Sequence, residues 1–144
     1  MSDDELKKTI LDFMKTQKFC VISTVSKDGK PEAALIGFSE TPELEITFGT
    51  SNQSRKFKNL QSNQNVAFEI GSGEPRITIQ YEGVAQPFDK GVFEKTGKFH
   101  LTKLPDSSKY VGKSDQVWFK VTPTWIRFTD SRTDHTAVYE LEQF

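Results

Sequence analysis

Apolar residues near the N-terminus change from a helical spacing to a strand spacing. Leu6, Ile10, Phe13 and Met14 recur at helical intervals behind a Ser-x-x-Glu capping-box pattern at residues 2–5, which predicts an amphipathic helix over about residues 3–16. The β-branched run 18–25 and the segment 31–38 then predict two strands. Asp28-Gly29 between them is a hairpin signal, because both residues tolerate a positive φ.

Strand patterns dominate the rest of the chain. Residues 44–48 alternate apolar and polar side chains and predict a third strand, which would form a meander with the first two. A short helix is expected from Ser54 to about Ser62, then strands over 65–71 and 77–88. Residues 89–110 suggest one or two helices followed by a loop at 105–109. A late strand pair, 115–121 and 125–130, is separated by a break at Pro123, and the tail 137–144 is ambiguous.

These elements predict a mainly β fold of six or seven strands with peripheral helices. A small closed or split β-barrel is the natural architecture, because closure removes exposed strand edges. The length of 144 residues suits a single domain over residues 1–144.

Composition narrows the classes of function. The formal net charge is −1, so no general attraction to nucleic acid or to an anionic membrane is expected, and any anion site must be local. The single cysteine, Cys20, excludes an internal disulfide and is expected to be a small buried apolar residue. His100 and His135 lack metal-ligand spacing, so no metal site is expected, and His100 is interpreted as a helix-surface residue. The polar N-terminus and the absence of a long apolar run make a cytoplasmic protein the default expectation.

The segment Thr47–Leu60, TFGTSNQSRKFKNL, carries the chemistry of an anion site. A strand passes through Gly49, Thr50 and Ser51 into a helix that begins near Ser54. The first backbone N–H groups of a helix lack partners, and the helix dipole places partial positive charge there. Arg55 and Lys56 lie in that first turn, where cations are disfavoured unless an anion offsets them. Together these groups predict a phosphate cradle.

A plain alternative remains open at this point: an ordinary Ser-capped surface helix with solvated cations. The segment is not a Walker-type loop, because the Gly-x-x-x-x-Gly-Lys-Ser/Thr pattern is absent. The GSGEPR turn also lacks the third glycine of a dinucleotide fingerprint and precedes a strand, which favours a simple hairpin connection.

The order of these features resembles the pyridoxamine 5′-phosphate oxidase-like family of FMN-binding split barrels, and most of all its small stress-protein-like members. The series FCVISTVSKDGKPEAALIGF, LEITFGTSNQSRKFKNLQSNQNVAFEI and ITIQYEGVAQ carries the resemblance over about residues 17–86. The likeness is looser through VWFKVTPTWIRFTD.

The resemblance implies FMN as the cofactor and a homodimer with FMN at the subunit interface. It implies that the strand around 32–36 runs along the flavin, that Ser54, Arg55 and Lys56 bind the phosphate, and that a polar residue near Thr78 reaches the ring. Two alternatives are open for Trp125, contact with the flavin across the dimer or a place in the core or interface, whereas Trp118 is expected in the core. The cofactor-binding candidates are Ala33, Ala34, Leu35, Phe48, Gly49, Thr50, Ser51, Ser54, Arg55, Lys56, Thr78 and Trp125.

Several departures separate this chain from the oxidase itself. The flavin strand begins with Glu32 where the oxidase has an arginine, and Gly37 stands where the oxidase has a lysine. The oxidase's C-terminal Arg-Leu-His substrate motif is missing, since Arg132 and His135 have the wrong spacing. Oxidation of pyridoxamine phosphate is therefore not expected, while FMN binding is.

The leading expectation for function is a flavin-dependent oxidoreductase that acts on a small organic substrate or takes electrons from a nicotinamide. No residue stands out as a proton donor, and the flavin would perform the difficult chemistry. The alternatives are a flavin-binding stress protein without turnover, a deazaflavin- or haem-binding relative on the same fold, and a barrel that has lost its cofactor and serves as an interaction module.

Overall fold

The computed structural model describes the backbone of residues 1–144 and the side chains of residues 1–89, 93 and 97–144. Its helices are α1 (Asp3–Thr16), α2 (Arg55–Ser62), α3 (Lys90–Lys103) and the 3-10 helix η1 (Pro105–Tyr110). Its strands are β1 (Phe19–Val25), β2 (Pro31–Gly37), β3 (Ser39–Glu40), β4 (Ile46–Ser51), β5 (Asn65–Ile70), β6 (Ile77–Pro87), β7 (Gln116–Asp130) and β8 (Ala137–Leu141).

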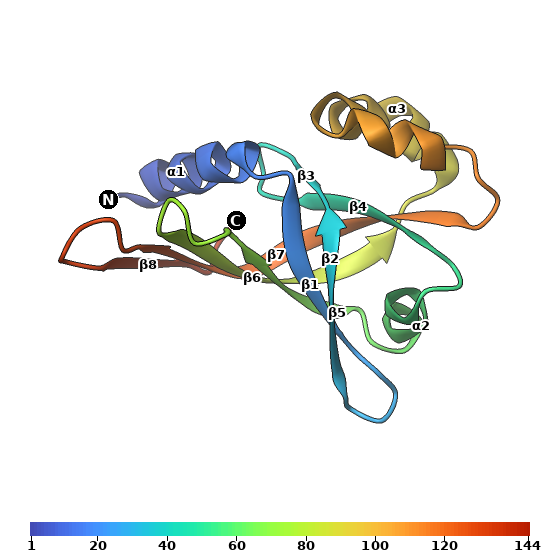
Figure 1. Ribbon diagram of the computed structural model, residues 1–144, viewed down its shortest axis with the longest axis horizontal. Helices are drawn as coiled ribbons and strands as arrows, with labels where there is room; N and C mark the ends of the chain where they lie inside the picture. Colours follow the sequence, from blue (N-terminus) through green and yellow to red (C-terminus); the bar gives the residue numbers. More distant parts are fainter.

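All strand pairs are antiparallel, and they form one curled sheet in the order β2-β1-β5-β6-β7-β4-β3, with β8 added to β7. Figure 1 shows the sheet curling into a half-barrel, with α1 and α3 along one side and α2 at the far end of β4. This is the mainly β split barrel that the sequence predicts.

The predicted meander of the first three strands is wrong. β1 and β2 form the expected hairpin, but β4 pairs with β7, and β2 and β4 lie at distant places in the strand order. The short β3 turns the chain away from β2 because it pairs with β4 through Ser39 and Glu40. This long-range pairing brings the β4–α2 junction close to the end of the chain segment that leads into β7.

The predicted break at Pro123 is also wrong, because β7 is one strand of 15 residues. Pairing with β6 shifts register between Glu82 and Gly83, opposite Trp125 and Pro123, so Thr124 is the extra residue of a bulge. A bulge is one of the few places where a strand tolerates a proline, which cannot donate to the ladder.

The interior of the half-barrel holds the apolar faces of α1 and of the strands. Ile10 and Met14 of α1 are fully buried, and Phe48 of β4 stacks on Phe119 of β7 with ring centroids 5.3 Å apart. The buried hydroxyl of Tyr81 donates to the carbonyl of Leu44 at 2.8 Å. Burying these aromatic and aliphatic side chains supplies the main stabilisation of the fold.

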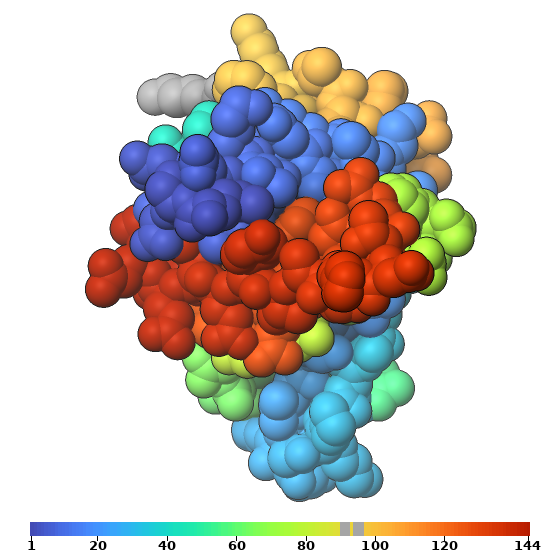
Figure 2. All heavy atoms as spheres, turned by 90° about the vertical axis from the view of Figure 1, so that its left-hand side faces the viewer, coloured from blue at the N-terminus to red at the C-terminus, as the bar shows by residue number. Residues whose placement is uncertain are grey.

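The N-terminal helix forms as predicted. The Ser2 hydroxyl accepts from the backbone N–H of Glu5, and the Glu5 carboxylate accepts from the backbone N–H of Ser2, which completes the capping box. In Figure 2 this helix, in dark blue, lies beside the C-terminal strands, in red, and Phe13 meets Phe128 edge to face at 6.3 Å. The N-terminal helix thus packs against the C-terminal strands of the sheet.

The remaining turns refine the sequence-based predictions. In the β1–β2 hairpin only Gly29 has a positive φ, at 78°, so Asp28 does not use the freedom that the dipeptide offers. The N–H of Gly29 donates to Ser26, which closes the turn. Residues 105–109, predicted as a loop, belong to the 3-10 helix η1.

Candidate functional site

Two neighbouring grooves lie where β2, the β4–α2 junction and the segment after η1 meet. One, of about 210 Å³, is lined by Ile22, Thr24, Glu32, Ala33, Ala34, Arg55 and Lys56. The other, of about 410 Å³, is lined by Leu35, Ile36, Gly49, Thr50, Ser51, Ser54, Lys56, Tyr110, Lys113, Asp115 and Gln116. Lys56 lines both, so the two grooves share one cationic wall and are treated together as the cofactor groove.

Most of the predicted cofactor-binding residues line this cofactor groove. They are Ala33, Ala34, Leu35, Gly49, Thr50, Ser51, Ser54, Arg55 and Lys56. Three predicted residues do not: Phe48, Thr78 and Trp125. Phe48 is fully buried on the inner face of β4, since side chains alternate along a strand, so its side chain packs in the core.

Thr78 and Trp125 lie on the same face of the sheet as Ala33 and Leu35 of β2 but several strands away. The register links Trp125 to Ala33 through Glu82, Ala67 and Ser23. Four strand spacings separate the two ends of this row, or about 19 Å. Thr78 on β6 is three strands from β2, or about 14 Å. A single chain therefore does not bring these two residues to the cofactor groove.

The N-terminus of α2 opens onto the cofactor groove. Ser54 is its N-cap, and the Ser54 hydroxyl accepts from the N–H of Phe57 at 3.2 Å and shares a 2.8 Å hydrogen bond with the Thr50 hydroxyl. Within the described part of the chain, the N–H groups of Arg55 and Lys56 donate to no acceptor. They are the free donors that a helix offers to an anion.

Arg55 does not face the groove as a free cation. Its guanidinium pairs with the Glu32 carboxylate, which also accepts at 2.8 Å from the side-chain amide of Asn59. Asn59 is buried and donates to the Thr24 hydroxyl at 2.9 Å as well. Glu32, only 18% exposed, is therefore held by two partners and offsets much of the positive charge of Arg55.

Lys56 is the groove-lining cation of α2 that keeps its charge uncompensated, whereas Lys58 on the same helix lines neither groove. Among the residues the structure describes, no carboxylate pairs with its ammonium group, and partial burial lowers the pKa of Lys56. A desolvated ammonium gains more from an anion than a fully hydrated one does. The arrangement can thus bind a phosphate through Lys56, the Thr50 hydroxyl and the α2 N-terminus.

Six residues that line the cofactor groove were not predicted: Ile22, Thr24, Tyr110, Lys113, Asp115 and Gln116. Asp115 is fixed by the 3.0 Å hydrogen bond that its carboxylate accepts from the Ser51 hydroxyl, and its carbonyl accepts from the N–H of Asn52 at 2.7 Å. Tyr110 ends η1, and Lys113, Asp115 and Gln116 follow it and reach the groove through the pairing of β7 with β4. No local sequence signal could have located them.

Trp118 of β7 forms a wall behind Gly49, and its position in the core is confirmed. It stacks on Phe93 with centroids 3.9 Å apart and meets the edge of His100 at 5.1 Å. A Cβ on Gly49 would lie 2.7 Å from the Trp118 ring, which requires glycine at this position. The Trp118 ring therefore restricts the groove-lining position 49 to a residue without a side chain.

His100 is not a surface residue, which corrects the sequence-based interpretation. It is 3% exposed, and its Nδ1 lies 2.8 Å from the Ser39 hydroxyl. Burial, with a smaller contribution from Lys103, lowers the pKa of His100 to about 4. The interpretation was wrong because the sequence of α3 alone does not reveal which side of the helix is covered. Trp118 and Ser39 of β3, both distant in sequence, contact His100.

Cys20 is the small buried residue that the sequence predicts. Burial raises the pKa of its thiol to about 12. No cluster of His, Cys, Asp and Glu suited to a metal ion occurs among the described residues. Within the same residues, no helix has the length and apolar character needed to cross a bilayer.

Comparison with known proteins places the chain in a family. The pyridoxamine 5′-phosphate oxidase family pattern matches residues 6–130, which is most of the sequence. The chain belongs to the pyridoxamine 5′-phosphate oxidase family. No protein in the curated set matches the sequence.

Solved structures of the same fold include proteins with different cofactors. General Stress Protein 26 from Bacillus anthracis is 26% identical, with 86% of this chain and 93% of that one covered at a TM-score of 0.70. An FMN-binding protein related to pyridoxamine 5′-phosphate oxidase, from Nostoc punctiforme, is 11% identical over 100% and 92% of the chains, with a TM-score of 0.76. HutZ, the haem storage protein from Vibrio cholerae, is 19% identical over 82% and 89%, with a TM-score of 0.64.

Within the pyridoxamine 5′-phosphate oxidase family, the structure gives the Glu32 departure a physical meaning. The residue stands at the start of β2, against the first turn of α2. It places a carboxylate beside the predicted phosphate site and couples β2 to α2 through Asn59. A member with an arginine in this position would have one more cation in the groove.

Proposed function

We propose that this chain binds FMN in the cofactor groove and uses it as a flavin-dependent oxidoreductase. The observation that carries the proposal is Lys56, which is partly desolvated, without a carboxylate partner among the described residues, and placed beside the free N–H groups of α2. A phosphate is the ligand that best suits one ammonium, a hydroxyl and a helix N-terminus.

The remaining residues of the groove suit the rest of FMN. Ala33, Ala34 and Leu35 of β2 present small or apolar side chains and backbone groups to a flat ring, and Leu35 is 70% exposed in the isolated chain. Thr50, Ser51 and Gln116 offer hydrogen-bonding groups between the ring and the phosphate end. When bound, the isoalloxazine would supply hydride transfer, and the protein would supply position and charge.

A homodimer is part of the proposal. Thr78 and Trp125 share the outer face of the sheet with Ala33 but lie about 14–19 Å from β2, so they would reach a flavin held by a second subunit. Sedimentation should give about 33 kDa, which is twice 16.4 kDa. A 16.4 kDa species in the presence of saturating FMN would contradict this part of the proposal.

Haem is the second candidate, because a structural neighbour is a haem storage protein. The described residues that line the cofactor groove include Tyr110 as a possible axial ligand, but neither histidine nor cysteine. The groove's donors suit a phosphate better than a porphyrin iron, so FMN is preferred.

The test is a comparison of ligands on the purified full-length chain. The protein is titrated with FMN, riboflavin and haemin while visible absorption and flavin fluorescence are recorded. FMN binding well above that of riboflavin supports the phosphate site. A Soret band with haemin and no response to FMN would overturn the assignment. Reduction of the bound flavin by NADH or NADPH then tests the oxidoreductase part. If neither donor reduces the bound flavin, the chain is only a flavin-binding protein.

A further inference from the structure

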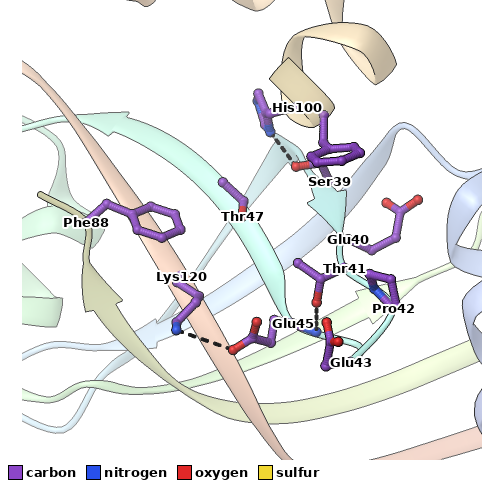
Figure 3. Close-up of a pocket in the computed structure, with 11 residues that line it drawn as sticks. Ser39, Glu40, Thr41, Pro42, Glu43, Glu45, Thr47, Phe88, His100 and Lys120 are labelled. Atoms are coloured by element: carbon purple, nitrogen blue, oxygen red, sulfur yellow. Dashed lines mark hydrogen bonds and ion pairs between the residues drawn. The ribbon is translucent and has the colours of Figure 1, made fainter. Parts of the chain in front are cut away.

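A second cavity of about 380 Å³ lies between the β3–β4 turn and α3, outside the cofactor groove. Figure 3 shows its lining, with Ser39 and His100 at one end, Glu43 and Glu45 at the other, and Phe88 at its side. Its volume is in the range of small-molecule sites. Nothing in the proposed flavin chemistry uses it.

Trp118 separates this cavity from the cofactor groove. Gln116, Trp118 and Lys120 point to the same face of β7, because side chains alternate along a strand. Gln116 lines the cofactor groove, Lys120 lines the second cavity, and the buried Trp118 ring stacked on Phe93 stands between them. The two sites are neighbours with a solid wall between them.

One end of the cavity is polar but uncharged. His100 and Ser39 are both buried and share a 2.8 Å hydrogen bond. Because burial lowers the pKa of His100 to about 4, its imidazole is neutral at pH 7. This end can exchange hydrogen bonds with a ligand hydroxyl without repelling a cation elsewhere in the cavity.

The opposite end is negatively charged. Glu45 is offset by Lys120, whose ammonium lies 3.4 Å from the Glu45 carboxylate. Glu43 is exposed and makes no hydrogen bond or ion pair with any residue that the structure describes. The third carboxylate, Glu40, is buried and paired with Lys103 at 2.5 Å. Glu43 is therefore the group that would attract a cation.

The walls between the two ends suit an aromatic body. Phe88 and Phe99 line the cavity, and the Phe99 side chain is 78% exposed. An aromatic ring placed there would cover apolar surface that now faces water. Charge at one end, a neutral hydrogen-bonding pair at the other and aromatic walls define one class of ligand.

We propose that this cavity is a second small-molecule site, for an arylalkylamine whose ring carries a hydroxyl group. Its ammonium group pairs with Glu43, its ring packs against Phe88 and Phe99, and its hydroxyl reaches the Ser39–His100 pair. The site is independent of the flavin phosphate at Lys56.

The probe is tyramine, titrated into the full-length chain saturated with FMN while tryptophan fluorescence and protein-detected NMR are followed. Saturable binding is expected with a Kd below about 1 mM. 3-(4-Hydroxyphenyl)propionate, which has the same ring but a carboxylate, should bind at least about tenfold more weakly, and phenethylamine, which lacks the hydroxyl, should bind with intermediate affinity.

Variants locate the site. Glu43→Gln should weaken tyramine binding about tenfold, and Phe99→Ala should weaken it as well, while both exposed positions leave folding intact. Glu74→Gln, at an exposed carboxylate in the β5–β6 turn, is the matched control and should leave the affinity unchanged. Lys56→Ala should also leave tyramine binding unchanged, which separates this site from the cofactor groove.

Any of three results would overturn the inference. They are no saturable binding of tyramine, equal affinity for the amine and the propionate, or unchanged affinity in Glu43→Gln. Loss of tyramine binding in Lys56→Ala would move the ligand to the cofactor groove and would also overturn it.

Discussion

Glu32 and Arg55 form an ion pair between the start of β2 and the first turn of α2. The carboxylate is mostly covered and further held by Asn59, whereas the guanidinium side chain is 78% exposed. A residue predicted to bind phosphate is thus already occupied by a partner from the same chain. This relationship divides the roles of the two adjacent cations, because Arg55 is offset and Lys56 is not.

Replacing Glu32 with Gln should raise the affinity for FMN. The amide keeps an oxygen that can accept from Asn59, so the fold is retained, but the competing negative charge disappears. Because the Arg55 side chain is exposed, the pair is valued as a surface ion pair of about 0.2–1 kcal/mol, so the gain in FMN affinity is up to about fivefold. Fluorescence titration with FMN measures the change in affinity. The affinity for riboflavin, which has no phosphate, should be the same in the variant and in the parent protein. Weaker FMN binding in this variant would show instead that Glu32 holds Arg55 in position for the phosphate.

Gly49→Ala should destabilise the protein by about 1–3 kcal/mol, because the added Cβ has no room. It would lie 2.7 Å from the Trp118 ring and 2.3 Å from the Gln116 amide. Urea denaturation of the apoprotein measures the change in the free energy of unfolding. Adding Gln116→Ala should restore only part of it, since the flexible amide can move aside but the stacked Trp118 cannot. Full recovery in the double variant would contradict the role given to Trp118.

The buried His100 should make stability depend on pH. In the unfolded chain the imidazole takes up a proton near its ordinary pKa of 6.5, whereas in the folded protein the pKa is about 4. Between these values the unfolded state binds more protons, so the free energy of unfolding should fall as pH drops from about 6.5 to about 4, by up to about 3 kcal/mol, and level off below.

Two histidine variants provide the comparison for that slope. His100→Gln should flatten this part of the pH profile at some cost in stability, because the titrating group is gone. His135→Gln, at an exposed position beyond β7, is the matched control and should keep the profile of the parent protein. An unchanged slope in His100→Gln would show that other groups cause it.

Ser39→Ala should destabilise the protein by about 1–3 kcal/mol, since it leaves the buried His100 Nδ1 without its partner. Denaturation in urea at pH 7 checks the value. Ser72→Ala, at an exposed turn, should have almost no effect. A neutral result for Ser39→Ala would mean that water reaches the imidazole from the second cavity.

Local patterns predicted the fold class and most of the groove. The capping box at Ser2 and the Ser54 cap depend on neighbours within one turn, so the sequence shows them directly. The strand–turn–helix segment 47–60 also carries its own geometry. The resemblance to the family added Ala33 and Leu35, which line the same groove.

The main errors involve long-range pairing. β4 was expected beside β2 but pairs with β7, and Pro123 was expected to end a strand that instead continues through a bulge. His100 looked exposed because its partners, Ser39 and Trp118, lie far away in sequence. Tyr110 and Gln116 escaped notice for the same reason. The placement of Thr78 and Trp125 at the flavin stays a prediction that depends on a second subunit.

The most direct test of the phosphate site is the affinity for FMN and riboflavin in the parent protein and in Lys56→Ala. The account predicts that FMN binds far more tightly than riboflavin, and that Lys56→Ala weakens FMN binding by about tenfold or more without changing riboflavin binding. Arg55→Ala, the matched control on the same helical turn, should cost less because Glu32 already offsets that cation. Equal affinities for FMN and riboflavin in the parent protein, or unchanged FMN affinity in a folded Lys56→Ala, would contradict the account.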